Sequence, residues 1–382
     1  MFRLACALGC LALTACDGDS GLRSRGSADV AAPDTRLEAL LGGVEREGFE
    51  LALAPRDFEF PRDHGPHPEF RHEWWYFTGH LDGTNGERFG FELTFFRYAL
   101  APASPAISAA SRWRSNQIYV AHFAITDVAR RSFHSAERRA REALQLAGAR
   151  APPLRVWVHD WSMDTVPTGW TLSAADGSYR LSLLLEPAVP PILNGERGFS
   201  RKSESPGAAS FYYSIPRLTA RGELWRDRER LDVAGTAWLD REWGSGALAS
   251  DQQGWDWFAL QLDDGSALMF YALRKRDGAR DAFSAGTWFK AGGGARHLPA
   301  TDVQIDVLDR WQSPRGDSYP SRWRLRSPAV GLDLELQPVL ADQELDTTPR
   351  YWEGAVDVRG RRGNTAVTGR GYVELTGYAS TP

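Results

Sequence analysis

The sequence predicts an all-β fold of two tandem antiparallel β-barrels with few short helices, and three observations support this prediction. Residues 71–83 are rich in aromatic side chains. After a polar turn they are followed by a segment at 89–97 that alternates apolar with polar or small residues, a pattern typical of a β-hairpin. A degraded copy of this hairpin lies at residues 255–274. Most other periodic segments are short and are separated by turns rich in Gly, Pro and Asp, which indicates an antiparallel meander.

The repeated hairpin indicates that the chain contains two related β units. Trp255 and Trp257 match Trp74 and Tyr76 at one constant offset in residue number. After a shorter turn, Arg274 at the end of the second hairpin corresponds to Arg97 at the end of the first. A chain of 382 residues also exceeds the length that one hydrophobic core usually organises. We therefore expect an N-terminal barrel at residues 55–240 and a C-terminal barrel at residues 241–382.

The N-terminal segment predicts export and lipid attachment. A short positive start precedes an apolar run at residues 4–13, which is too short to span a bilayer, and a small-residue cleavage site that ends in Cys16. We expect a lipoprotein signal peptide at residues 1–15, a lipid on Cys16, and a flexible tether at residues 16–54 with one short helix near residues 37–44. This predicts a protein anchored by its lipid in a bacterial cell envelope, facing the periplasm or the exterior. The alternative is an ordinary signal peptide with a chance cysteine.

Composition and charge narrow the classes of partner. A net charge of -4, with no basic cluster interleaved with aromatic residues, argues against nucleic acid. The 15 Trp, 18 Phe and 11 Tyr indicate ring-lined interiors suited to a hydrophobic small molecule, although β proteins also use aromatic residues for packing alone. The sequence contains no dinucleotide-binding glycine pattern, no P-loop and no HExxH motif, and no His and carboxylate set has a spacing that fixes a metal site. We therefore expect neither an organic cofactor nor a metal, and the sequence does not indicate an oligomeric state.

Between and after the two hairpins the sequence predicts mostly strands. Residues 116–127 alternate as a strand does, whereas residues 132–145, rich in Arg, Glu and Ala, are predicted to form the one helix of the first half. Residues 187–206 are irregular, and segments of this length are often functional, at a barrel mouth or as a lid. The other predicted strands lie at residues 155–161, 169–174, 179–186, 211–217, 218–225, 231–239, 283–290, 304–311, 321–325, 332–336, 351–358 and 371–378.

The first candidate site lies on the first hairpin and the strand after it, and it comprises His72, Glu73, Trp74, Tyr76, Arg97 and His122. Because side chains alternate along a strand, we expect His72, Trp74 and Tyr76 on one face and Glu73 on the other. A carboxyl group surrounded by rings would be desolvated, and desolvation raises its pKa toward the range in which it can donate a proton. The alternative is that Glu73 and Arg97 form a buried ion pair and that His72 only caps the strand.

The second candidate site is the segment at residues 238–244, which contains Trp238, Asp240, Glu242 and Trp243. If the strand persists, Asp240 and Glu242 lie on one face with Trp238 beside Asp240. Two neighbouring carboxyl groups can divide into one ionised and one protonated group, which suits acid–base catalysis. The alternative is a strand-to-loop corner held by pairs of arginine and carboxylate.

Several motifs, in the right order, resemble the secreted lipocalin-like "predicted hydrolase" family, which is related to carotenoid 1,2-hydratase (hydroxyneurosporene synthase). They lie at residues 72–79, 211–214, 238–244, 351–354 and 371–378. The resemblance spans residues 56–378. It implies two tandem lipocalin-like β-barrels and a hydrophobic ligand.

The resemblance also implies a chemistry. In the carotenoid hydratases an aspartate protonates the terminal double bond, aromatic neighbours stabilise the cation, and water completes the addition, with no organic cofactor. By this resemblance Asp240 is the acid, and Trp238 stands where the hydratases have a tyrosine. The His-x-Trp element of the hydratases has no clear counterpart, and Tyr212 and Tyr213 occupy its region.

Two functions are therefore expected. The first is a membrane-tethered lipocalin-like protein that binds a hydrophobic, isoprenoid or lipid-like molecule. The second is a cofactor-independent hydratase or hydrolase acting on such a molecule by general acid catalysis, with Asp240 as the acid and Glu242, or His72 and Glu73, assisting. The residues expected to bind the ligand are Trp74, Tyr76, Arg97, His122, Tyr212, Tyr213, Trp238, Trp243, Trp255 and Trp257.

Overall fold

The computed structural model describes residues 47–102, 115–246 and 248–379. The expected signal peptide, the lipid site Cys16, the short helix near residues 37–44 and most of the tether lie outside these residues. Within them the secondary structure is almost entirely β, and the helices are three 3-10 turns: η1 (Arg62–His64), η2 (Ala300–Asp302) and η3 (Pro328–Val330). None of the described helices has the length and apolar character needed to cross a bilayer. The all-β class predicted from the sequence is confirmed.

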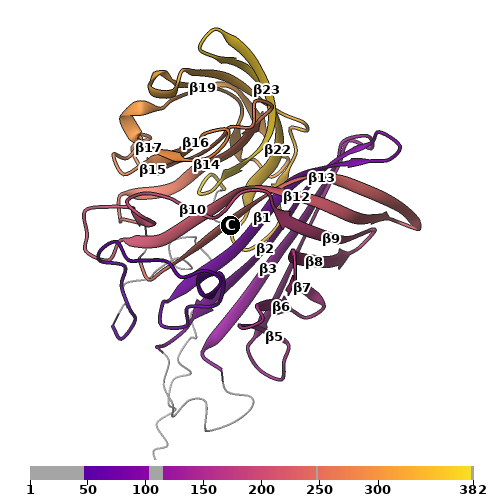
Figure 1. Cartoon of the computed structure of the whole chain (residues 1–382), viewed down its shortest axis with the longest axis vertical. Coiled ribbons are helices and arrows are strands. Elements are labelled where there is room, and N and C mark those ends of the chain that lie inside the picture. Colours follow the sequence, from indigo (N-terminus) through magenta and orange to yellow (C-terminus); the bar gives the residue numbers. More distant parts are fainter. Residues whose placement is uncertain (1–46, 103–114, 247, 380–382) are drawn as a thin grey trace, which may run out of the picture. The chain divides into compact units, whose positions relative to one another are not determined.

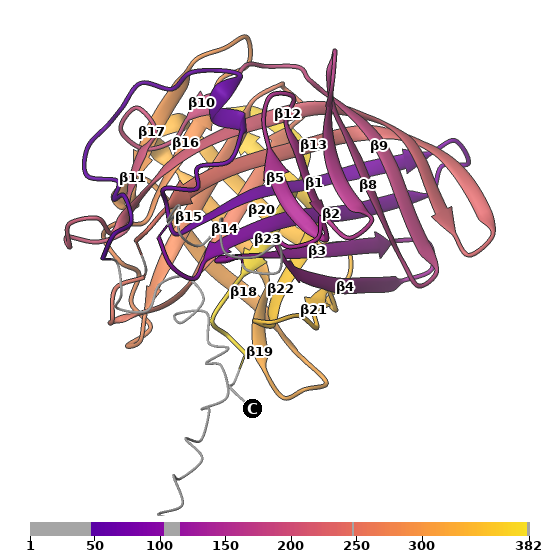
Figure 2. The same ribbon diagram turned by 90° about the horizontal axis from the view of Figure 1, so that it is seen from below.

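The first sheet is antiparallel and nearly closed into a barrel. Its strand order is β4-β3-β2-β1-β13-β12-β9-β8-β7-β6-β5, with β10 and β11 paired to β12. Figure 2 shows β4, β3, β2 and β1 side by side in this order. The strands are β1 (His72–Gly83), β2 (Arg88–Ala99), β3 (Gln117–Asp127), β4 (Ser132–Arg141), β5 (Ala147–Arg150), β6 (Arg155–Val158), β7 (Trp161–Val166), β8 (Gly169–Asp176), β9 (Tyr179–Pro187), β10 (Ile192–Leu193), β11 (Phe199–Arg201), β12 (Ala209–Arg226) and β13 (Glu229–Gly244).

The second sheet is an antiparallel half-barrel formed by the last part of the chain, coloured orange to yellow in Figure 1. Its strand order is β17-β16-β15-β14-β23-β22-β20-β19-β18, with β21 paired to β22. The strands are β14 (Gln252–Leu262), β15 (Ala267–Lys275), β16 (Ala285–Phe289), β17 (Ala295–Pro299), β18 (Gln304–Gln312), β19 (Ser318–Ser327), β20 (Leu332–Pro338), β21 (Glu344–Leu345), β22 (Tyr351–Arg362) and β23 (Thr365–Leu375).

The helix predicted at residues 132–145 is wrong, because its first ten residues form strand β4. This strand pairs with β3 along its whole length, from Ile118 opposite Arg141 to Asp127 opposite Ser132. The edge of β3 would otherwise expose unpaired backbone groups, and a ladder of this length outweighs the modest helix preference of Arg, Glu and Ala. The alternation of β4 also lets Ala136 pack against the core of the first barrel.

The two hairpins that the sequence pattern relates have the same register. Arg97 lies opposite Glu73 in the first, and Arg274 lies opposite Gly254 in the second, where Gly254 is the residue that the repeat matches to Glu73. A register of this kind fixes which face each side chain takes, because a slip of one residue would exchange the two faces.

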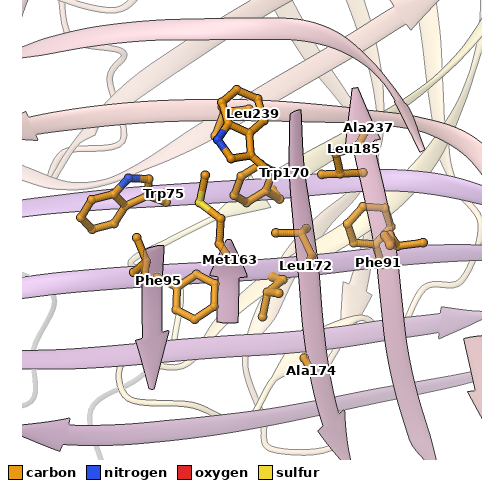
Figure 3. Packing of buried hydrophobic residues seen from close by; sticks show 14 of the residues in the cluster. Trp75, Phe91, Phe95, Met163, Trp170, Leu172, Ala174, Leu185, Ala237 and Leu239 are labelled. Carbon is orange, nitrogen blue, oxygen red and sulfur yellow. The ribbon is translucent and has the colours of Figure 1, made fainter. Parts of the chain in front are cut away.

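The interior of the first barrel is filled with apolar side chains. Figure 3 shows Trp75, Met163, Trp170 and Leu172 packed together, and all four belong to one buried cluster. A second cluster, which includes Trp323 and other large side chains, fills the concave side of the second sheet. Close packing of this kind leaves little room for a ligand in these interiors, so a binding site is expected on the outer faces of the sheets.

Polar contacts join the outer faces of the two sheets. His80 Nε2 on β1 lies 2.8 Å from the backbone oxygen of Gly371 on β23, and Thr126 Oγ1 donates to Gln343 Oε1 at 2.8 Å. A third buried cluster, which draws residues such as Tyr76 and Trp257 from both sheets, lies at this junction. The junction is therefore a second apolar interior with its own polar groups.

Candidate active site between the two sheets

A cavity of about 150 Å³ lies at the junction of the two sheets. It is lined from the first sheet by β1, β2, β3, β12 and β13 and from the second sheet by β14, β15, β22 and β23. A dry cavity of about this volume is large enough for benzene in other proteins. The enclosed space therefore suits a small ring or the end group of a larger apolar molecule.

Strand alternation decides which side chains face this cavity. On β1, His72, Trp74 and Tyr76 line it, whereas Trp75 belongs to the barrel core. On β13 the strand continues past residue 240, so Asp240 and Glu242 both line the cavity. The faces expected for these residues are the faces that the structure gives them.

The structure brings most of the expected site residues together. Those that line the cavity are His72, Trp74, Tyr76, His122, Tyr212, Asp240, Glu242, Trp255 and Trp257. Trp238 lies beside the cavity, where its ring packs against Trp257 with centroids 6.3 Å apart. Glu73, Arg97, Tyr213 and Trp243 do not line the cavity and lie on the barrel side of the first sheet.

Asp240 is the most enclosed acid of this wall. Its Oδ1 accepts hydrogen bonds from Ser214 Oγ at 2.5 Å and from Trp238 Nε1 at 2.7 Å, and its Oδ2 accepts one from the Tyr212 hydroxyl. Burial raises the pKa of Asp240 to about 7, although these three donors oppose the rise. Trp257 Nε1 of the second sheet donates to the Tyr212 oxygen at 3.2 Å, so a hydrogen-bonded chain runs from the second sheet through Tyr212 to Asp240.

Glu242 has a different environment. Its Oε1 accepts a hydrogen bond from Ser210 Oγ and lies 3.2 Å from Lys202 Nζ. Burial alone would lower the pKa of Lys202, but Glu242 and Tyr271 more than offset this and raise it. Lys202 follows β11 in the irregular segment at residues 187–206, which thus supplies a cation to the site. Of the two carboxyl groups of this wall, Glu242 therefore lies beside the cation Lys202, whereas Asp240 is held by hydrogen bonds from Tyr212, Ser214 and Trp238.

Glu73 belongs to a buried ion network in the barrel interior. It accepts hydrogen bonds from Arg97 Nε and Arg241 Nη2, and the His67 backbone nitrogen donates to both carboxylate oxygens at 3.1 Å. Burial alone would raise the pKa of Glu73, but the two guanidinium groups hold it far below its usual range. Glu73 is therefore an ionised structural group in this fold, as the ion-pair interpretation of the sequence has it.

Tyr213 and Trp243 pack around the same network. The Tyr213 hydroxyl lies 2.6 Å from His64 Nδ1, and the Trp243 ring stacks on His67 with centroids 3.9 Å apart. No group of three or more His, Cys, Asp or Glu residues within the described parts of the chain is arranged to hold a metal ion.

His122 lies at the other end of the cavity. Its Nδ1 is 2.8 Å from the Tyr351 hydroxyl of the second sheet, and its Nε2 is 3.3 Å from Glu137 Oε2 on β4. Glu137 also accepts a hydrogen bond at 2.8 Å from the Thr348 backbone nitrogen. His122 is thus held between the sheets by contacts that fix the orientation of its ring.

The second sheet contributes two acids that were not predicted from the sequence. Glu374 lines the cavity, and it lies opposite Trp257 as Asp240 lies opposite Tyr76. Its strand neighbour Glu353 accepts a hydrogen bond from the Tyr76 hydroxyl. The match of Glu374 to Asp240 depends on strand pairing, so the motif at residues 371–378 was its only signal in the sequence. Lys202 had no comparable signal, because it lies in an irregular segment.

Comparison with known proteins places this fold in a family. The model of the AttH-like family matches residues 51–378. A crystal structure of a Nitrosomonas europaea protein assigned to AttH is 37% identical, covers 86% of this chain and 100% of its own, and has a TM-score of 0.76. No curated protein matches the sequence.

Two more distant structures share the fold. Kievitone hydratase from Nectria haematococca is 16% identical, with a TM-score of 0.65 over 87% of this chain and 97% of its own. CghA with Sch210972 is 14% identical, with a TM-score of 0.52 over 84% of this chain and 93% of its own. The family resemblance drawn from the sequence motifs is confirmed, and kievitone hydratase shares the fold. With a family match across residues 51–378 and a relative of 37% identity, the chain belongs to the AttH-like family.

Proposed function

We propose that this protein binds an apolar, unsaturated molecule in the junction cavity and catalyses the addition of water to its double bond without a cofactor. The observation that carries the proposal is Asp240, a buried acid with a pKa raised to about 7 that faces a cavity lined by aromatic rings. A carboxyl group with a pKa near the working pH is a suitable general acid, because a useful fraction of it is protonated.

The hydrogen bonds around Asp240 provide a route for its proton. When Asp240 is ionised, it accepts from the Tyr212 hydroxyl. When Asp240 is protonated, it donates to the Tyr212 oxygen, and the Tyr212 hydroxyl turns its own proton toward the cavity that Tyr212 lines. Proton transfer to one carbon of the double bond leaves a cation at the other, which the faces of Trp257 and Tyr212 stabilise.

One structure that shares the fold carries a name that supports a hydratase. The name of kievitone hydratase denotes addition of water, and the structure of CghA with Sch210972 names a bound organic molecule. The first describes a reaction that needs an acid and water, which is the chemistry that Asp240 and an enclosed cavity suit. Both structures are less than 20% identical to this chain, and Asp240 with its surroundings is the main support for hydration here.

Binding without turnover is the second candidate function. One observation favours it: three donors already satisfy Asp240 as a carboxylate, so the acid also serves to hold Tyr212, Ser214 and Trp238 in place. In that case the cavity would enclose the end of a lipid-like molecule, and Asp240 would only order its wall.

Citronellol, a ten-carbon alcohol with a trisubstituted double bond near one end of its chain, tests the two candidates. Its binding is followed by quenching of tryptophan fluorescence, since Trp74, Trp255 and Trp257 line the cavity. Its hydration is followed by incorporation of oxygen-18 from labelled water. We expect turnover by the wild type, and a loss of about 100-fold or more in Asp240→Asn with little change in affinity.

The matched control is Asp333→Asn, which removes a carboxylate paired with Arg324 on the exposed side of the second sheet. This variant should hydrate citronellol at the wild-type rate. Unchanged turnover in Asp240→Asn would remove Asp240 from the mechanism, and quenching without oxygen-18 incorporation by the wild type would favour binding alone.

The proposal includes a lipid anchor on Cys16, supported by the apolar run and small-residue cleavage site before it. An anchor of this kind would hold the barrels in a bacterial envelope, close to apolar molecules dissolved in the membrane. Incorporation of labelled palmitate into the wild type and its absence from Cys16→Ser would support the anchor. Equal labelling of both proteins would reject it.

A further inference from the structure

Glu374 faces the cavity from the second sheet, across from the wall that carries Asp240. The two residues occupy equivalent places in the internal repeat, since Asp240 lies opposite Tyr76 on β1 and Glu374 lies opposite Trp257 on β14. Both line the same cavity. The junction therefore presents one acid from each sheet to a shared space.

Glu374 is held in place by contacts from its own sheet. Its Oε1 accepts a hydrogen bond from Trp255 Nε1 at 3.0 Å. Glu353 lies directly across on β22 and is fully buried, with one oxygen bonded by the Tyr76 hydroxyl and the other without a hydrogen-bond partner in the described structure. Unlike Glu353, Glu374 is only partly buried, and its exposed part faces the cavity.

We propose that Glu374 is the second catalytic carboxyl group of the site and exchanges a proton with the water that adds to the double bond. This inference rests on the proposed function, because it names the group that accepts a proton from the water, a step that Asp240 as the acid does not perform. Two carboxyl groups that share one proton across a substrate are a recurrent arrangement for acid–base chemistry.

The hydration balances with these two groups. The proton of Asp240 forms a new C–H bond at one alkene carbon, the π electrons of the double bond supply that bond, and the other carbon becomes a cation. A lone pair of water forms the C–O bond, and a water O–H bond breaks so that its proton passes to the Glu374 carboxylate. Return of one proton from Glu374 to Asp240 restores the site, and dehydration follows the same steps in reverse.

The charges around Glu374 are consistent with a proton shared between the two walls. Burial and the neighbouring Glu92 raise the pKa of Glu374 to about 8, with smaller contributions from Asp240 and Glu242, while the bond from Trp255 opposes the rise. Burial likewise raises the pKa of Asp240 to about 7. Ionisation of Asp240 therefore hinders ionisation of Glu374.

Other titratable groups also face this pair. Glu92 on β2 and Glu353 on β22 are buried carboxyl groups whose pKa values burial raises. Lys202 and His122 line the cavity, and the Tyr76 hydroxyl is bonded to Glu353. Among the carboxyl groups named in this subsection, Glu374 is the one that lines the cavity from the second sheet.

The test is the pH dependence of citronellol hydration in full-length wild type, Glu374→Gln and Asp240→Asn. The wild type should show a bell, because one group must be ionised and the other protonated. In Glu374→Gln the rate at pH 7.5 should fall by about 100-fold and the acidic limb should disappear, while quenching by citronellol is retained. In Asp240→Asn the alkaline limb should disappear instead.

Each outcome decides a different point. A Glu374→Gln protein that keeps wild-type turnover and both limbs, while Asp240→Asn loses about 100-fold in rate, overturns the role of Glu374 and leaves the proposed function standing. Absence of hydration by the wild type overturns both. If circular dichroism shows that Glu374→Gln does not fold, Glu374→Asp decides, since it withdraws the carboxyl group by one methylene. Loss of about 10-fold or more in its rate with both limbs kept supports the proposal, and an unchanged rate overturns it.

Discussion

Removing the charge of Glu73 should destabilise the protein strongly, although Glu73 lies outside the cavity. In Glu73→Gln the side chain keeps its size, but one of its two acceptor oxygens becomes an amide nitrogen. That nitrogen would face a guanidinium group, because Arg97 Nε donates to one oxygen and Arg241 Nη2 to the other. The substitution therefore leaves two buried cations, which are 1% and 0% exposed, without their shared counter-charge.

The size of the effect follows from this burial. Removing one partner of a buried ion pair usually costs about 3–5 kcal/mol, because the remaining charge stays desolvated. The whole free energy of unfolding of a domain is about 5–15 kcal/mol, so the loss is a large share of it. The two arginines hold the pKa of Glu73 far below its usual range. The stabilisation is therefore fully present above about pH 4.3, the ordinary pKa of glutamate, and is lost as the pH falls through the lower pKa of the folded state.

Chemical denaturation of the two proteins measures this difference. Unfolding is followed by tryptophan fluorescence and by circular dichroism, and coincident transitions justify a two-state treatment. The gap between wild type and Glu73→Gln should be constant between about pH 5 and 8 and should narrow below about pH 4. The control is Glu335→Gln, whose partner Arg359 is largely exposed and 3.4 Å away, and its midpoint should not move. A loss below about 1 kcal/mol in Glu73→Gln would refute the reasoning.

Two further predictions concern the junction. Tyr212→Phe removes the hydroxyl that donates to Asp240 and accepts from Trp257. Without this donor the pKa of Asp240 should rise above about 7, so the alkaline limb of hydration should move to higher pH. Turnover should also fall by about 10-fold or more. An unmoved limb would contradict the relay. Gly90→Ala would place a Cβ 2.5 Å from the Tyr372 hydroxyl and 2.8 Å from Ala355 Cβ, so it should cost about 1–3 kcal/mol in thermal unfolding by pushing the sheets apart. An unchanged midpoint would show that the junction yields without cost.

Much of the fold could be predicted because its signals are local. The alternation along the first hairpin predicted that Trp74 and Tyr76 share one face of β1 and that Glu73 takes the other, and the two aromatic residues line the cavity whereas Glu73 does not. The failure at residues 132–145 has the opposite cause. No pattern within ten residues shows that the edge of β3 needs a partner, and pairing between distant segments is what makes β4 a strand.

The site was predicted in part for the same reason. Asp240 and Glu242 were found because they lie two residues apart on one strand beside tryptophan. Glu374 was missed although its segment is one of the family motifs, because its correspondence with Asp240 depends on its register with Trp257. Lys202 reaches Glu242 from an irregular segment, so only the folded chain brings the two together.

The position of the cavity follows from how a repeated hairpin uses its two faces. One face of each sheet is committed to apolar packing, so side chains such as Trp75 in the first sheet are unavailable to a ligand. The opposite face of the first sheet lies against the opposite face of the second sheet, and these two faces carry the side chains that line the cavity. Because the repeat matches Asp240 with Glu374 on strands paired to the two hairpins, duplication of one acid-bearing unit yields two acids around one cavity. A site built in this way needs both sheets, so a barrel separated from its partner would lose the enclosed space on which a raised pKa and exclusion of bulk water depend.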